Sequence, residues 1–374
     1  MKEPSLTLGI EEEYQIVDPE TRELKSYITE ILESDRMVLR ELKPELHQSV
    51  VEVGSNVCET VSDARAELIR LRGLVSDHVG ESGLRIVAAG SHPFSSWMKQ
   101  EITPLERYAG IMKDLGEVAH GNLIFGMHVH VGIEDREFLI DAMNVARYFL
   151  PHVLALSSSS PFWEGRNTGL KSFRSIVWRR FPRTGIPQRF ESWTEFEHMV
   201  DTLVRSESIP DGTKIWWDVR PHYNYPTLEF RVCDMCTRID EVVCVAAIFQ
   251  AIIAKLWKLR HDNMTFRVYP ASLIDENKWR AARYGVKGKL VDFGKQQEVA
   301  FRDLTEELIG WFLDDVLDDL GTRAEVEYAF RIIDEGSSAD RQIATYERTG
   351  ELNAVVDQLI AETAEGVVAE AAAS

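Results

Sequence analysis

Gly126-Met127-His128-Val129-His130-Val131-Gly132 is the stretch that decides the fold of this chain. Its residues alternate as on a β-strand, where neighbouring side chains point to opposite faces of the sheet. His128 and His130 therefore share one face, and the apolar residues between them share the other. The flanking glycines let another backbone or a ligand approach closely. The stretch predicts a strand with an apolar back and an imidazole front.

Two other stretches alternate in the same way and carry charged side chains. In Gly9-Ile10-Glu11-Glu12-Glu13-Tyr14, the first and third carboxylates share a face, as do Glu229 and Arg231 in Thr227-Leu228-Glu229-Phe230-Arg231-Val232. A central strand does not keep like charges on one face without a counter-ion, which a divalent cation can supply. Carboxylate and imidazole groups suit Mg²⁺ or Mn²⁺, and arginine suits bidentate contact with phosphate. The three strands together predict a metal–phosphate site on one face of a sheet.

Each pattern also has a simpler interpretation. Three acids in a row are often a solvated edge strand, an Arg and a Glu on one face can be a salt bridge, and a His in a strand usually binds nothing. A zinc site is disfavoured, because no Cys or third His lies at zinc spacing. The sequence has no Walker loop, so a protein of this kind that used ATP would bind it through metals on the sheet. It also has no G-x-S-x-G elbow, which disfavours serine hydrolase chemistry.

Composition narrows the class of protein further. The 374 residues carry a formal net charge of −19, which disfavours nucleic acids and anionic membrane surfaces as partners because both attract basic proteins. The first residues lack the apolar core of a signal peptide. Four cysteines are too few for a disulfide scaffold of this length, and Cys233-x-x-Cys236 has no second pair, which favours a structural role. We expect a cytoplasmic protein with free thiols that acts on small molecules.

Hydrophobic periodicity predicts an α+β fold. Strands are expected at 6–17, 50–53 and 84–89, and helices at 29–40, from a cap at Ser62, at 103–120, at 136–156 with a kink or boundary at Pro151, at 194–205 and at 241–260. The helix expected at 241–260 is apolar around most of its circumference, which indicates either a core helix or a subunit contact. If it is a subunit contact, the protein would be a homodimer. No linker divides the chain, so we expect a single catalytic domain over 1–374, mostly helical from about 240 to 374.

A basic island interrupts this acidic chain at 157–188, where Ser, Gly and Pro are also frequent. A long irregular segment in a compact protein is more often a functional loop than filler. We therefore predict that this segment orders over the site and excludes water. Its basic residues, with one just beyond it, are Arg166, Lys171, Arg174, Arg179, Arg180, Arg183 and Arg189.

These residues together resemble the carboxylate–amine ligase family, whose members are labelled as glutamate–cysteine ligases of type 2. The match runs in order from about residue 6 to about residue 260. The motifs that carry it are Gly9-Ile10-Glu11-Glu12-Glu13-Tyr14-Gln15, Gly126-Met127-His128-Val129-His130-Val131-Gly132, Ser160-Pro161-Phe162-Trp163-Glu164-Gly165-Arg166, Trp216-Trp217-Asp218-Val219-Arg220-Pro221 and Thr227-Leu228-Glu229-Phe230-Arg231-Val232-Cys233-Asp234. The chain departs from the family at Tyr14, where Phe is common, and at Ser159, where Asn is common.

The resemblance implies a glutamine-synthetase-like antiparallel catalytic β-sheet backed by helices, with a helical C-terminal part. It also implies an enzyme that uses ATP and Mg²⁺, or Mn²⁺, to join a carboxylate to an amine through an acyl-phosphate. The family label points to glutamate as the acid and cysteine as the amine. A metal-dependent hydrolase, and a nucleotide- or metal-binding protein without ligase activity, are the alternatives that the residues leave open.

The resemblance further implies roles for single residues. Arg231 would contact the transferring phosphate, and Arg220 and Arg174 would hold substrate carboxylate or phosphate. His130 is left open as a further ligand. The implied metal ligands are Glu11, Glu13, Glu45, Glu52, His128 and Glu229.

Overall fold

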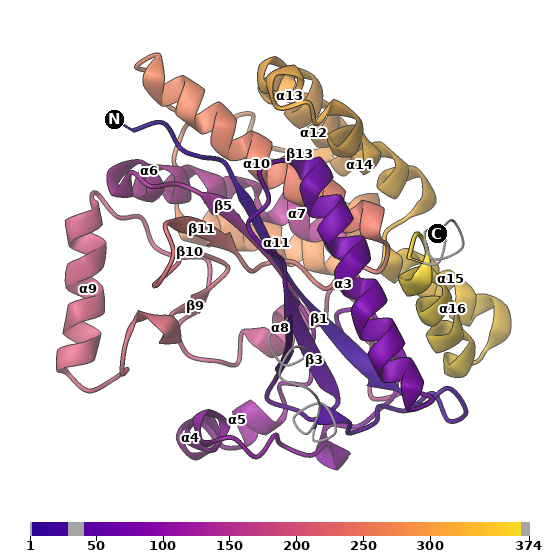
Figure 1. Ribbon diagram of the computed structural model, residues 1–374. Helices are drawn as coiled ribbons and strands as arrows, with labels where there is room; N and C mark the ends of the chain where they lie inside the picture. The colour runs from indigo at the N-terminus through magenta and orange to yellow at the C-terminus, as the bar shows by residue number, and fades with distance from the viewer. Residues whose placement is uncertain (1, 29–40, 368–374) are drawn as a thin grey trace.

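The computed structural model describes residues 2–28 and 41–367, and its centre is a seven-stranded sheet (Figure 1). The strand order is β10-β11-β5-β1-β3-β2, with β4 paired to β1, and every pairing in this sheet is antiparallel, as predicted. The three polar motifs lie on β1, β5 and β11, which are neighbours. The strands are β1 (Leu8–Val17), β2 (Leu42–Pro44), β3 (Val50–Gly54), β4 (Arg85–Val87), β5 (Met127–Gly132), β10 (Val219–Pro221) and β11 (Thr227–Phe230).

The register of the sheet brings the polar residues of separate strands into line. Residues directly opposite each other on adjacent strands share a face of the sheet. One face therefore carries a continuous row of carboxylates, imidazoles and guanidinium groups. The opposite pairs are Glu11–His128, His130–Glu229, Arg220–Glu229 and Glu13–Glu52.

Two long helices, α3 (Val61–Glu81) and α10 (Ile239–His261), pack against the apolar face of the sheet (Figure 1). By length and composition α10 could also cross a membrane, but 78% of its most apolar window is buried inside the fold. Of the two predicted alternatives, α10 is therefore the core helix. Because its apolar surface is already covered, it gives no support to the homodimer, which stays a prediction.

One charged pair lies on the apolar side of β1. Glu12 and Arg72 of α3 are both fully buried, and Arg72 Nη2 donates to Glu12 Oε1 at 2.6 Å. The Tyr14 hydroxyl donates to the same carboxylate, and Arg72 also donates to the carbonyls of Cys236 and Thr237. The pair thus ties β1 to α3 and to the chain that leads into α10. The sequence analysis did not predict it.

The helices around this core follow the predicted periodicity, with corrections at their ends. The helix expected from Ser62 is capped by Thr60, which forms a capping box with Asp63. The helix expected at 103–120 is two helices, because the chain turns at Gly116 with a φ of 54°. Pro151 lies in the first turn of a new helix, so it marks a boundary. These helices are α4 (Glu106–Leu115), α5 (Glu117–His120), α6 (Arg136–Ala146), α7 (Leu150–Ser157) and α9 (Trp193–Arg205).

The segment after residue 240 is mostly helical, as predicted, but a hairpin of β12 (Lys289–Asp292) and β13 (Gln297–Ala300) interrupts it. Its helices share one hydrophobic core with the sheet, and the single domain over 1–374 stays a prediction. All four cysteines are free and buried, as expected. The helix predicted at 29–40 lies outside the described residues. The C-terminal helices are α11 (Ala271–Tyr284), α12 (Phe301–Glu307), α13 (Asp314–Leu320), α14 (Arg323–Glu335), α15 (Ser338–Thr349) and α16 (Leu352–Ala364).

The basic island has local structure of its own. It contains the short helix α8 (Arg174–Trp178), the pair β6 (Phe162–Trp163) and β7 (Arg166–Asn167), and β8 (Thr184–Gly185). The last of these pairs in parallel with β9 (Trp216–Trp217). The strand that carries Glu229, β11, forms an antiparallel pair with β10, whereas β9 belongs to a separate small sheet.

Candidate active site

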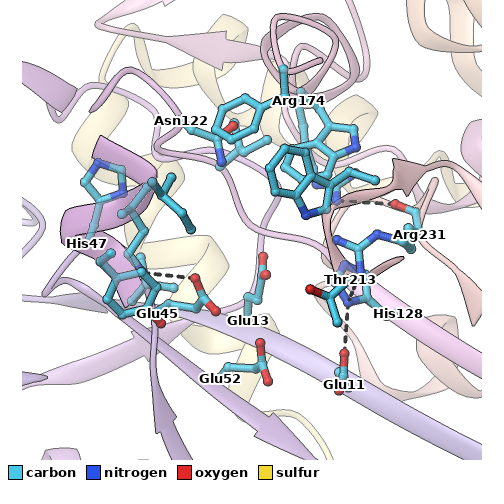
Figure 2. A pocket seen from close by; sticks show the side chains of 18 of the residues that line it. Glu11, Glu13, Glu45, His47, Glu52, Asn122, His128, Arg174, Thr213 and Arg231 are labelled. Atoms are coloured by element: carbon cyan, nitrogen blue, oxygen red, sulfur yellow. Dashed lines mark hydrogen bonds and ion pairs between the residues drawn. The ribbon is translucent and has the colours of Figure 1, made fainter. Parts of the chain in front are cut away.

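The polar face of the sheet is the floor of a cavity of about 410 Å³. Carboxylates rise from the floor, Arg231 and His128 stand at one side, and Arg174 lies across the opening from Glu13 (Figure 2). All nine residues that the sequence proposed for the site line this one cavity. They are Glu11, Glu13, Glu45, Glu52, His128, Arg174, Arg220, Glu229 and Arg231.

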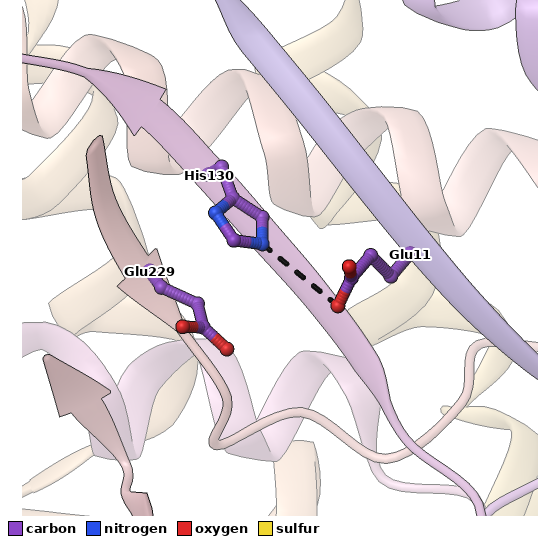
Figure 3. A group of neighbouring side chains, drawn as sticks. All are labelled: Glu11, His130 and Glu229. Carbon is purple, nitrogen blue, oxygen red and sulfur yellow. Dashed lines mark ion pairs between the residues drawn. The ribbon is translucent and has the colours of Figure 1, made fainter. Parts of the chain in front are cut away.

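Three side chains from three adjacent strands converge at one point of the polar face of the sheet (Figure 3). One ligand atom each from Glu11, His130 and Glu229 lies within 4.8 Å of the others. His130 Nδ1 is 3.1 Å from Thr227 Oγ1, which orients the ring. His130 Nε2 is buried 3.9 Å from Glu11 Oε2, with no hydrogen-bond partner among the described residues. A lone imidazole nitrogen that faces two carboxylates fits a divalent cation.

His128, the histidine predicted as a ligand, has a different environment. Its Nδ1 lies 3.0 Å from Glu11 Oε2 and 3.5 Å from Arg231 Nη1. Burial and the charge of Arg231 lower the pKa of His128, so a neutral ring that donates its Nδ1–H to Glu11 is favoured. In the structure His128 therefore orients Glu11, and its role as a metal ligand stays a prediction.

A second acidic cluster lies beside the first, where Glu13, Glu45 and Glu52 face the cavity. Burial and the neighbouring charge of Glu13 raise the pKa of Glu45 to about 7. Burial, Glu11 and Glu45 raise the pKa of Glu52 well above its usual value. Two cations lie near this cluster: Lys43 Nζ is 3.2 Å from Glu52 Oε1, and the charge of Arg107 partly offsets the raised pKa of Glu45. More carboxylates than cations face this space, so it suits a second divalent ion.

These raised pKa values predict a pH effect that can be isolated by one substitution. Because the folded-state pKa of Glu45 lies above its unfolded value, the protonated carboxyl stabilises the fold at low pH, and that contribution is lost as pH rises through about 7. Glu45→Gln keeps an uncharged side chain throughout. In EDTA, we expect the melting temperature of Glu45→Gln, relative to that of the wild type, to be higher at about pH 8 than at about pH 5.

Thermal melting of both proteins at the two pH values measures this difference. Buried histidines with lowered pKa values, such as His47 and His92, change stability in the opposite direction. They are present in both proteins and cancel in the comparison. Excess Mg²⁺ should reverse the gain, because it neutralises the ionised carboxylate of the wild type. A difference that stays constant with pH in EDTA would contradict the raised pKa.

Two arginines hold the buried carboxylate of Glu229, which is 1% exposed. Burial opposes its ionisation, but the charges of Arg231 and Arg220 hold the pKa of Glu229 well below its usual range. Arg220 Nε donates to Glu229 at 2.7 Å, and its Nη1 donates to the carbonyls of Thr213 and Ile215. Arg220 is thus occupied by protein groups, and the substrate contact predicted for it stays a prediction. Arg231 Nε, by contrast, is buried without a partner in the described chain.

Arg174 of α8 lines the side of the cavity that lies across from Glu13 (Figure 2). Its Nη1 and Nη2 each lie 3.4 Å from a backbone carbonyl at the end of β11, and its Nε is buried with no partner among residues 2–28 and 41–367. Its guanidinium crosses Gly126, where an added Cβ would collide with it. The other basic residues of the island do not line the cavity. Those with described partners elsewhere include Lys171 with Asp340, Arg179 with Asp275, and Arg183 with the Lys214 carbonyl.

Sequence reasoning missed the apolar wall of the cavity. Trp178 lies beneath Arg231, whose guanidinium carbon is 5.6 Å from the centre of the ring, and its Nε1 is buried without a described partner. Its position four residues after Arg174 would have placed it on the same face had α8 been predicted. The other wall residues come from distant segments and carry no joint signal. They include Leu46, Tyr108, Ile111, Ile124, Phe181 and Trp216.

Solved structures with the same arrangement identify the fold. A bifunctional glutathione synthetase from Pasteurella multocida matches with a TM-score of 0.69 and 14% identity, over 98% of this chain and 54% of that one. A glutamate–cysteine ligase from Francisella tularensis, solved in complex with AMP, matches with a TM-score of 0.68 and 13% identity, over 100% of this chain and 95% of that one. The protein therefore has the glutamine-synthetase-like ligase fold that the sequence predicted.

Comparison at the level of sequence gives the family. The model of glutamate–cysteine ligase family 2 matches residues 7–358. Relatives named "Putative glutamate--cysteine ligase 2" include one from Herpetosiphon aurantiacus, 59% identical over 96% of this chain and 94% of its own length. Another, from Sorangium cellulosum, is 53% identical over 96% of this chain and 97% of its own length. This chain belongs to glutamate–cysteine ligase family 2.

Proposed function

We propose that this protein is an ATP-dependent carboxylate–amine ligase that forms an amide through an acyl-phosphate, with glutamate as the acid and cysteine as the first amine to test. One observation carries the proposal: Glu11, His130 and Glu229 are grouped closely enough to hold a cation, and Glu11 and Glu229 line the same cavity as Arg231 and Arg174, which each keep a buried N–H without a described partner. A nucleotide polyphosphate with its metal ion needs both kinds of group close together. The AMP bound to the Francisella tularensis enzyme supports an adenine nucleotide as the ligand.

The two acidic clusters would divide the metal ions between them. Glu11, His130 and Glu229 would hold one Mg²⁺ or Mn²⁺, and Glu13, Glu45 and Glu52 would hold a second. When bound, the cations supply positive charge to the phosphate oxygens. His128 would keep Glu11 in place by donating to it, and Arg220 would do the same for Glu229.

The remaining residues would act on the reacting groups in two steps. First, an oxygen of the substrate carboxylate attacks the γ-phosphorus of ATP, the bond to the β–γ bridging oxygen breaks, and ADP leaves. Arg231 would contact the transferred phosphoryl group, with Arg174 on the nucleotide phosphates. Second, the amine nitrogen attacks the acyl carbon, its bond to the phosphate oxygen breaks, and phosphate and a proton are released. Trp178 and Phe181 would cover the cavity and protect the acyl-phosphate from water.

Phosphate release from ATP and Mg²⁺ with glutamate, screened against a panel of amines that includes cysteine, tests this function. We expect release to depend on one amine, with ADP, phosphate and the amide formed in equal amounts and the amide identified by mass spectrometry. Phosphate release with no amide from any pair would indicate a hydrolase. If ATP and Mg²⁺ raised the melting temperature without any turnover, the protein would be a nucleotide-binding protein without ligase activity.

A further inference from the structure

A fully buried carboxylate behind the cavity contacts the basic island. Asp234 follows β11 and is 0% exposed. Its Oδ2 accepts the Ser160 hydroxyl at 2.6 Å and the Ser159 backbone N–H at 3.0 Å, and its Oδ1 accepts the Ser172 hydroxyl at 2.7 Å. All three partners belong to the island, so one side chain gathers two separate parts of that segment against the sheet.

The same two hydroxyls hold the first turn of α8. The backbone N–H of Arg174 donates to Ser160 Oγ at 3.0 Å, and that of Ser175 donates to Ser172 Oγ at 3.3 Å. A helix start with its N–H groups bound by side-chain oxygens is fixed in place. Asp234 in turn fixes those oxygens, because each hydroxyl hydrogen points to its carboxylate.

Two glycines leave these groups little room to move. A Cβ at Gly90 would lie 2.8 Å from Cγ of Asp234, and a Cβ at Gly126 would collide with the Arg174 guanidinium. Gly126 and Asp234 also face each other in an isolated β-bridge. The Asp234 carboxylate is therefore packed on the backbone at Gly90, and the Arg174 guanidinium is packed on the backbone at Gly126, just before β5.

We propose that Asp234 is a positioning residue for the nucleotide phosphates. Through Ser160 and Ser172 it holds α8, whose Arg174 and Trp178 line the cavity and each carry one buried N–H donor without a described partner. This role rests on the proposed function, because it assigns those two donors to phosphate oxygens. Asp234 itself lies outside the set of residues that line the cavity.

Asp234→Asn tests the role, because it keeps the shape of the side chain and removes its charge. We expect faster backbone hydrogen exchange in peptides that cover 159–178, without a change elsewhere, and about tenfold weaker binding of a non-hydrolysable ATP analogue with Mg²⁺. The matched control is Asp292→Asn, another buried carboxylate, which accepts the N–H groups of Gly294 and Lys295 away from the cavity. It should change neither measurement.

A double-mutant cycle separates positioning from general destabilisation. Arg174→Gln alone should also weaken binding of the ATP analogue. Adding Asp234→Asn to Arg174→Gln should weaken that binding further by less than about twofold, because the two residues act on one contact. Additive losses, or unchanged exchange at 159–178 with normal binding, would overturn the positioning role alone. Failure of the wild type to bind the analogue at all would overturn the proposed function.

Discussion

Glu229→Gln is expected to lower the rate of ATP-dependent amide formation on the order of a thousandfold. Glutamine preserves the length of the side chain but removes the charge that Arg220 and Arg231 share. It also removes one of the three proposed metal ligands at the convergence of β1, β5 and β11. In the proposed mechanism, loss of a metal ligand and loss of the group that orients Arg231 act on the same transferred phosphoryl group, so their effects are expected to combine.

Initial rates of phosphate release measure this effect, with Mn²⁺ affinity as a second readout that does not require turnover. Glu327→Gln, which changes a half-exposed acid of α14, is the control and should keep the wild-type rate. Glu11→Gln should resemble Glu229→Gln in both readouts, because it removes a ligand from the same cluster. If Glu229→Gln kept a rate near that of the wild type with its fold intact, Glu229 would not belong to the catalytic centre.

Arg72→Met is expected to lower the free energy of unfolding by about 3–5 kcal/mol. The substitution fills most of the volume but leaves the carboxylate of Glu12 buried with no cation, since both side chains are 0% exposed. Two backbone carbonyls, of Cys236 and Thr237, also lose their donor. Urea denaturation followed by circular dichroism measures the change.

Two comparisons make the second prediction specific. The double variant Glu12→Leu with Arg72→Met should recover much of the loss, because a buried apolar pair carries no uncompensated charge. Arg323→Ala, which breaks a partly exposed ion pair with Asp314 and Asp318, should cost at most about 1 kcal/mol. A cost below about 1 kcal/mol for Arg72→Met would show that the buried pair does not hold β1 to α3.

The sheet and its polar face were predictable because strand periodicity is a local property. A period of two residues assigns Glu11 and Glu13 to one face wherever the strand lies, and the same rule holds for Glu229 and Arg231. Helix ends were less predictable. Gly116 turns the chain within a pattern that reads as one helix, and a capping box at Thr60 replaces the cap expected at Ser62.

The partners of each charged group could not be read in this way. His128 and His130 are equivalent in the sequence, yet one contacts Glu11 and Arg231, and the other presents a bare nitrogen to Glu11 and Glu229. The basic island reads as a uniform stretch of positive charge, but Arg174 is the member of it that lines the cavity. For the two histidines, these differences depend on residues that are distant along the chain.

The sequence by itself determined the family, through motifs that are short along the chain, and the polar face of each strand, through a period of two residues. The resemblance to the family then implied the antiparallel sheet and polar residues that line the cavity. Only the tertiary structure decided that Glu12 belongs to a buried pair with Arg72, that α10 is a core helix, and that Asp234 holds α8. Each of these depends on which surfaces meet when distant segments pack. Burial changes the energy of each charged group, and the local sequence does not reveal which groups become buried.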